Sequence, residues 1–159
     1  MSIPRAHAAM LALSLVLAGA AWGMDTPKTE SAPPKDPALE QGRAAIAKKD
    51  WAGAQGILRD AVARNPQDAD AHNLYAYAIR SGPNPPMDLV FRHYNEALRL
   101  DPKHRGAHEY LGEAYLMSGN VAKAKEHLAQ LDKLCTFGCE EYTKLKKEVA
   151  AYEQQQAKK

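Results

Sequence analysis

Ala71–Ile79 reads AHNLYAYAI and Ala107–Tyr115 reads AHEYLGEAY, so one pattern returns after 36 residues (107 − 71 = 36). Small side chains stand at the same places in both copies, at positions 71/107, 76/112 and 78/114. In the middle of a helix, a small residue allows a second backbone to approach closely. Asn65-Pro66 and Asp101-Pro102 are also 36 residues apart (101 − 65 = 36), and a proline cannot continue a helix. We interpret the pattern as an internal repeat of helical units that end at a fixed place.

Turn residues divide each repeat into two helices. From about residue 36 to residue 152 the apolar residues follow helical spacing, and no stretch alternates as a β-strand would. Clusters of Gly, Pro, Asn and Asp predict turns at residues 49–51, 81–86 and 118–120. Gly119 suits the left-handed conformation that closes a helix. The second helix of each unit is expected to begin with a good N-cap residue: Asp50, Asn84 and Asn120. Asn84 is followed by Pro85 and Pro86, and either proline suits the first turn of a helix.

At these positions the sequence resembles the tetratricopeptide repeat family, whose unit is 34 residues long and consists of two antiparallel helices with a closing proline. The resemblance implies an all-α fold: a right-handed α-solenoid of three helical hairpins, at residues 37–66, 67–102 and 103–134, followed by a C-terminal capping helix. The middle unit is two residues longer than the family pattern, and we assign the extra residues to the turn at 81–86. The matching residues are Gly42, Ala54, Leu58, Ala61 and Pro66 in the first unit, Tyr75, Ala76, Tyr94, Ala97 and Pro102 in the second, and Leu111, Gly112, Tyr115, Ala124 and Leu128 in the third.

The resemblance also implies a concave groove that binds a peptide or protein segment. Most aromatic and aliphatic residues at helical spacing are expected to fill the core. Some family members hold the terminal carboxylate of a peptide with Lys, Arg and Asn side chains. Here Glu109 and Glu113 occupy the third unit's share of the groove, which disfavours recognition of an acidic tail. The more polar residues of the leading helices are the groove candidates: Arg43, Asn73, Tyr77, Arg80, Glu109 and Glu113.

After the third unit, residues 135–155 predict a capping helix, and residues 156–159 a polar tail. Apolar residues recur there every three or four positions, and Lys144, Lys146 and Lys147 fall on the opposite side. Such a helix covers the exposed apolar end of a solenoid. Cys135 and Cys139 precede or begin this helix, and in an oxidising compartment we expect a disulfide between them. Thiol-redox chemistry or copper handling by the same two cysteines is the alternative.

The N-terminus predicts export. Arg5 precedes an uncharged apolar run at residues 8–21, typical of the signal peptide that we assign to residues 1–23. Cleavage is expected after Gly23, with Ala20 as an earlier alternative. The run is short for a permanent membrane helix, which needs about 20 apolar residues. Residues 24–36 form a proline-rich linker, and the periplasm is the expected compartment, with secretion as the alternative.

Composition and charge exclude several other functions. Twenty-one Lys and Arg against nineteen Asp and Glu leave a formal charge of +2, which does not indicate a nucleic-acid partner. His104 and His108 share the spacing of one helical face, but the motif is H-x-x-x-H-E and not the zinc-binding H-E-x-x-H, so we expect no metal site and no cofactor. No catalytic arrangement stands out. The sequence therefore predicts a noncatalytic module for a protein or peptide partner, with self-association as a further possibility and no membrane contact beyond the signal peptide.

Overall fold

The computed structural model describes residues 36–158, and this part of the chain consists of helices joined by short turns, with no strand. The predicted signal peptide, and the predicted linker up to residue 35, lie outside the described residues. No helix among residues 36–158 combines the length and the apolar character needed to cross a membrane. The helices are α1 (Pro37–Ala47), α2 (Trp51–Arg64), α3 (Ala69–Ser81), α4 (Met87–Leu100), α5 (Arg105–Met117), α6 (Val121–Leu134) and α7 (Glu140–Gln156).

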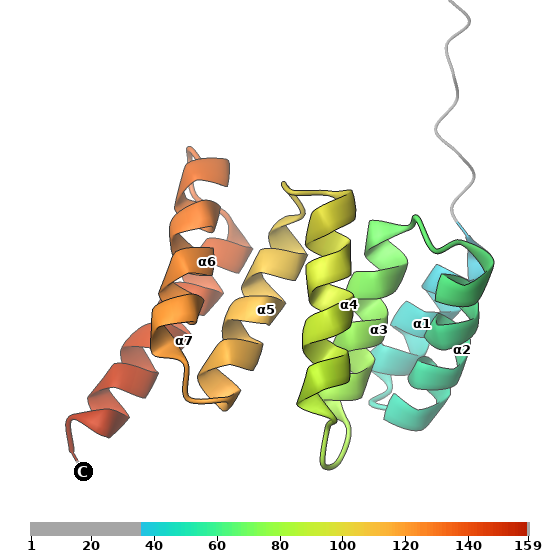
Figure 1. Cartoon of the computed structure of the whole chain (residues 1–159), viewed down its shortest axis with the longest axis horizontal. Coiled ribbons are helices and arrows are strands. Elements are labelled where there is room, and N and C mark those ends of the chain that lie inside the picture. Colours follow the sequence, from blue (N-terminus) through green and yellow to red (C-terminus); the bar gives the residue numbers. More distant parts are fainter. Residues whose placement is uncertain (1–35, 159) are drawn as a thin grey trace, which may run out of the picture. The chain divides into compact units, whose positions relative to one another are not determined.

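The helices are stacked as three antiparallel hairpins followed by one further helix, as Figure 1 shows. Each helix contacts the next along the chain, and the first helices of successive hairpins also contact one another: α1 with α3, α3 with α5, and α5 with α7. Within the described residues, α2, α4 and α6 make no such contacts among themselves. The odd-numbered helices therefore line the inner side of the stack. The prediction of an all-α helical solenoid is confirmed.

Most of the predicted helix starts are confirmed, and one is wrong. The Asp50 carboxylate accepts a hydrogen bond from the backbone N–H of Gly53, and Asn120 caps α6 in the same way. Asn84 caps nothing, because α4 begins only after Pro86, which stands at the cap position without a side-chain hydrogen bond. A residue that precedes a proline is pushed out of the helical region, so two successive prolines delay the helix. Gly119 has φ +78°, as its predicted role requires.

Two glycines show why the repeat needs small residues on its leading helices. A Cβ atom placed on Gly42 would lie 2.5 Å from Cδ2 of Leu58, a fully buried side chain of α2. A Cβ atom on Gly112 would lie 2.5 Å from Cδ2 of Leu145 in α7. Both separations are far below van der Waals contact, so any larger residue would push the helices apart.

A histidine pair joins the two helices of the second hairpin. Nδ1 of His72 lies 2.9 Å from Nδ1 of His93, and Nε2 of His72 lies 3.1 Å from the carbonyl oxygen of Pro66. A carbonyl oxygen only accepts, so His72 donates through Nε2 and its Nδ1 accepts the proton that His93 donates. Burial and the adjacent His72 lower the pKa of His93 to about 4, which keeps His93 neutral at pH 7.

The third hairpin repeats this arrangement with different residues. Nδ1 of His108 lies 3.0 Å from Nδ1 of His127, and Nε2 of His108 lies 3.1 Å from the carbonyl oxygen of Pro102. Burial and the adjacent His108 lower the pKa of His127 to about 4. In both of these hairpins the pair ties the leading helix to its trailing helix and to the turn that ends the previous unit.

Helix α7 covers the end of the stack. Its buried residues Leu145 and Val149 pack with Leu116 and Leu131 of the third hairpin. Cys139 stands at the N-cap, and its Sγ accepts a 3.5 Å hydrogen bond from the backbone N–H of Tyr142. The helix begins at Glu140, several residues later than the start of the region predicted to cap the solenoid.

Candidate functional site

The six groove candidates all lie on the inner helices α1, α3 and α5. Matching the repeats through Gly42, Ala76 and Gly112 places these helices in a common register, and equivalent positions form rows across the inner side. Two of these rows contain five of the candidates. The first row is Leu39, Asn73 and Glu109, and the second is Arg43, Tyr77 and Glu113.

Arg80 is engaged inside the structure. Its guanidinium lies over the rings of Tyr77 and Tyr110, 5.4 Å and 5.8 Å from their centroids, and donates a hydrogen bond of 3.3 Å to the hydroxyl of Tyr94. It also forms an ion pair with Glu113. The side chains of Arg80 and Glu113 are only 11% and 13% exposed. The structure thus brings three candidates together, but Arg80 and Glu113 neutralise each other and fix the positions of the two tyrosines.

Asn73 and Glu109 are buried polar residues of the first row. Asn73 is 5% exposed, and its Oδ1 has no hydrogen-bond partner in the described part of the chain. Glu109 is 3% exposed, and Nζ of Lys144 is 3.9 Å from its carboxylate. Burial, followed by the nearby charge of Glu113, raises the pKa of Glu109 to about 7. These two side chains are polar groups with few partners, which is uncommon in a helical core.

Arg43 and Tyr77 border an open hollow. The hollow has a volume of about 260 Å³ and combines aliphatic and aromatic walls with one charged side chain. Arg43 is exposed and lies 3.5 Å from the carboxylate of Asp70, so it stands at the edge of the hollow and within reach of a ligand. The lining residues are Arg43, Ile46, Leu74, Tyr77 and Tyr110.

Sequence reasoning did not identify Tyr110, Leu74 or Lys144 as part of this face. Tyr110 and Leu74 belong to the repeated pattern, whose aromatic and aliphatic residues are expected mostly to fill the core, whereas both also border the hollow. Lys144 was assigned to the solvent side of the capping helix, but it reaches Glu109 and also forms a 2.8 Å ion pair with Glu140. The sequence does not predict the contact between Lys144 and Glu109, because this contact depends on how α7 packs on α5.

A second, polar hollow of about 320 Å³ lies where α3, α5 and α7 begin. His104, the N-cap of α5, accepts a hydrogen bond from the Ala107 backbone through Nδ1, and its Nε2 lies 3.0 Å from Asp70. His108 instead pairs with His127, so the structure gives the two histidines of the H-x-x-x-H-E motif separate partners. The lining residues are Asp70, Asp101, Lys103, His104, Arg105, Gly106 and Glu141.

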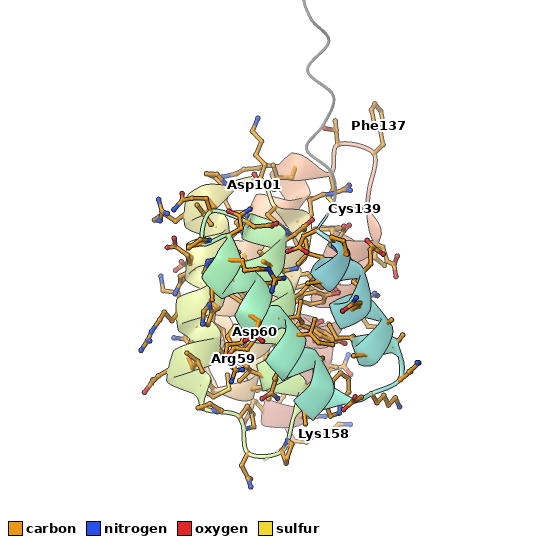
Figure 2. The ribbon with its side chains drawn as sticks, turned by 90° about the vertical axis from the view of Figure 1, so that its right-hand side faces the viewer. Arg59, Asp60, Asp101, Phe137, Cys139 and Lys158 are labelled. Carbon is orange, nitrogen blue, oxygen red and sulfur yellow. A yellow bond between two sulfur atoms is a disulfide. The ribbon has the colours of Figure 1, made fainter. Side chains whose placement is uncertain are left out.

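The two cysteines lie together in the turn between α6 and α7. Their Cα atoms are 5.5 Å apart and their Sγ atoms 2.04 Å apart, the separation of a disulfide. Gly138, with φ +84°, provides the left-handed residue in this turn. A carboxylate oxygen of Glu141 lies within 4.8 Å of the sulfur atoms, so the reduced form would offer two thiolates and a carboxylate to a metal ion. Figure 2 shows Phe137, a fully exposed side chain, projecting from the same turn.

Stacked hairpins with an inner face of partly polar side chains define a helical repeat protein of the interaction type. Two family models described as tetratricopeptide repeat match residues 39–86 and 90–146, and the chain belongs to the tetratricopeptide repeat family. The fold of this family is typically a noncatalytic scaffold for protein interactions. No curated protein sequence matches the chain.

Solved structures with the same fold include several that are bound to other proteins or peptides. The type III secretion translocator chaperone SycD of Yersinia enterocolitica is 14% identical, with a TM-score of 0.66 over 76% of this chain and 83% of SycD. A structure of SycD in complex with a peptide of the translocator YopD is 15% identical, with a TM-score of 0.60 over 72% of this chain and 86% of that one. The TPR2B-domain:pHsp70 complex of yeast Sti1 is 22% identical, with a TM-score of 0.65 over 74% of this chain and 94% of that one. Fold and family together support a protein–protein interaction module.

Proposed function

We propose that this chain is a noncatalytic module that binds an extended peptide or protein segment on the inner face formed by α1, α3, α5 and α7. The observation that carries the proposal is the hollow of about 260 Å³ between Arg43, Tyr77 and Tyr110. Its walls are mainly apolar, and a few polar groups surround them, the composition expected of a ligand pocket. The Arg80–Glu113 pair holds the tyrosines in place before any ligand arrives, which lowers the cost of ordering them on binding.

Site-specific crosslinking tests this proposal. A photoreactive phenylalanine analogue replaces Tyr77 on the inner face or, as the control, Arg92, an exposed residue of α4. Irradiation in cells that express the full chain should give a discrete crosslinked product with the probe at position 77 and none at position 92. Equal products from both faces, or none from position 77, would contradict an inner-face binding site.

We also propose that the protein is exported and acts in the periplasm. The support is the sequence itself: Arg5, the apolar run at residues 8–21 and small residues before the expected cleavage site. In that oxidising compartment Cys135 and Cys139 form a disulfide that fixes the turn into α7. Intact mass of the protein from the periplasmic fraction tests both points, since cleavage after Gly23 and loss of two hydrogens each give a defined mass.

The cluster of Cys135, Cys139 and Glu141 favours a second candidate function, copper or thiol handling. Thiolate ligands suit Cu(I), and Cys139 and Glu141 are partly exposed. A Cu(I) titration of the reduced protein, against a Cys135→Ser/Cys139→Ser variant, tests this function. A disulfide that resists glutathione, together with no Cu(I) binding after forced reduction, would exclude it.

A further inference from the structure

Asn73 and Glu109 form a polar row with unmet hydrogen-bonding capacity. They occupy equivalent positions in α3 and α5, two helices that contact each other. Both residues are at least nine-tenths buried, at 5% and 3% exposed. Oδ1 of Asn73 has no partner in the described residues, and the nearest cation to Glu109 is the half-exposed Lys144, at 3.9 Å. Oδ1 of Asn73 can only accept, and the Glu109 carboxyl accepts through both oxygens once it is ionised.

The Asn73 amide faces the helix that carries Glu109. A Cβ atom placed on Gly106 of α5 would lie 3.5 Å from Nδ2 of Asn73. Residues three apart share one face of a helix, so Glu109 lies one turn further along the same face of α5 as Gly106. The amide and the carboxyl therefore border the same strip of the inner side.

This strip lies between the two hollows. Gly106 borders the polar hollow of about 320 Å³, and Tyr110, next to Glu109, borders the hollow of about 260 Å³. On α3, Asn73 stands between Asp70 of the polar hollow and Leu74 of the other. An extended segment that crosses the inner face from one hollow to the other would pass over Asn73 and Glu109.

The charges around the strip are unbalanced toward the acidic side. Arg80 is paired with Glu113, and Arg43 lies against Asp70. Lys144 is shared between Glu109 and the exposed Glu140. A buried acceptor without a donor costs about 1–3 kcal/mol, and a buried carboxylate costs more. A ligand that brings donors and positive charge would satisfy both groups.

We propose that Asn73 and Glu109 bind a cationic side chain, Lys or Arg, of an extended peptide whose neighbouring apolar side chain fills the hollow between Tyr77 and Tyr110. The inference rests on the proposed inner-face function and specifies its ligand. Charge complementarity supports this occupant, because the row offers an acceptor without a partner within the described chain and a carboxyl whose nearest cation, Lys144, is shared with Glu140.

Proton release provides an independent signature. The pKa of Glu109, raised to about 7 by burial, means that the carboxyl is protonated in much of the free protein at neutral pH. The charged groups that face it are Glu113 on its own helix and Lys144, Glu141 and Glu140 on α7. A bound cation favours the ionised carboxylate, so binding releases a proton and affinity rises as pH increases from about 6 to 8.

The test compares two acetylated and amidated hexapeptides, Ala-Ala-Leu-Lys-Ala-Ala and the same peptide with Glu in place of Lys. Binding to the full chain is followed by amide chemical shifts in ¹⁵N NMR spectra. The protein variants are Glu109→Gln, which keeps the shape of the side chain, and Glu126→Gln, the matched loss of one acid on the outer helix α6, whose side chain is 61% exposed. Unchanged spectra outside the site show that each variant is folded.

The expected result is that the Lys peptide shifts amides of α3 and α5 and binds at least tenfold more tightly than the Glu peptide. Glu109→Gln should weaken that binding about tenfold and abolish its increase with pH, whereas Glu126→Gln should change neither. Equal or tighter binding of the Glu peptide at the same amides, or no effect of Glu109→Gln, would overturn the inference and leave inner-face binding intact. Absence of binding by both peptides would also overturn it, and the crosslinking at position 77 would then decide the proposed function separately.

Discussion

The first hairpin and the two that follow it place different chemistry at the same positions of one repeat. The first hairpin has Ala38 and Leu39 on its leading helix, and both are buried in an apolar cluster with Leu58. The second has His72 and Asn73 at the equivalent places, and the third has His108 and Glu109. All four of these polar residues are buried.

The trailing helices follow the same division. Ile57 packs against the apolar cluster of the first hairpin, where the next two hairpins have His93 and His127. The comparison shows that the same repeat backbone accommodates either an apolar pair or a histidine pair between its two helices. An apolar pair gains from burial alone, whereas a histidine pair must satisfy every donor and acceptor to be stable in the same place. The polar hairpins therefore respond to pH and to single substitutions in ways that the first does not.

Among the single substitutions, the largest effect is expected in the apolar hairpin. Leu58→Ala removes a fully buried side chain that fills the space above Gly42, and should lower the free energy of unfolding by about 2–5 kcal/mol. Urea denaturation followed by circular dichroism measures the loss. Leu98→Ala, a partly buried position in the second hairpin, serves as the milder control, and an equal loss at both positions would contradict the special role of Leu58.

Acid should destabilise the two polar hairpins. Because the pKa values of His93 and His127 are lowered from about 6.5 to about 4 on folding, the unfolded chain binds more protons between these values. Stability is then fully present above about pH 6.5 and falls as pH decreases toward 4, by at most about 1.4 kcal/mol per pH unit for each histidine. Urea midpoints across this range measure the slope.

The raised pKa of Glu109 acts with the opposite sign, since it removes stability as pH rises toward 7. The acid experiment is therefore best performed in the Glu109→Gln background, which removes this opposing contribution. The charged neighbours Glu96 and Arg92 of His93, and Glu126 and Lys123 of His127, remain unchanged in that variant. A flat profile between pH 6.5 and 4 would show that the pairs do not titrate as described.

Breaking one histidine pair from one side should have a smaller effect at neutral pH. His108→Ala leaves the Nδ1–H of His127 without its acceptor and the carbonyl of Pro102 without its donor. The expected loss is about 1–3 kcal/mol, measured by urea denaturation at pH 7.5. Lys103→Ala, at an exposed position of the preceding turn, is the control. If His108→Ala lowers stability no more than Lys103→Ala does, the histidine pair does not stabilise the fold.

The smallest effect is expected when the second hairpin receives the residues of the first. The double substitution His72→Ala/His93→Ile removes both partners and introduces an apolar contact like that of the first hairpin. The carbonyl oxygen of the exposed Pro66 can then accept a hydrogen bond from water. Replacement of a whole buried pair by apolar groups is close to neutral, so stability at pH 7.5 should change by less than about 1.5 kcal/mol. About half of the acid sensitivity should disappear, as the same pH series would show.

Much of the fold was predictable, because its signals are local. Helical spacing, the prolines at 66 and 102 and the glycine at 119 act within a few residues of themselves. The error at Asn84 was also local, since the effect of two successive prolines outweighed a good N-cap residue. For the candidate site, the six predicted residues lie on the inner helices, but the sequence did not show which of them are engaged inside the structure, because Arg80 and Glu113 pair across two hairpins.

By itself, the sequence determined the repeat, the hairpins and the family. Periodicity and turn residues suffice for this, since each helix is shaped by neighbours along the chain. The tertiary structure alone decided that His72 meets His93, that Lys144 reaches Glu109 and that Oδ1 of Asn73 is buried with no hydrogen-bond partner among residues 36–158. Those contacts join residues 21 or more positions apart, and depend on how side chains interlock between helices.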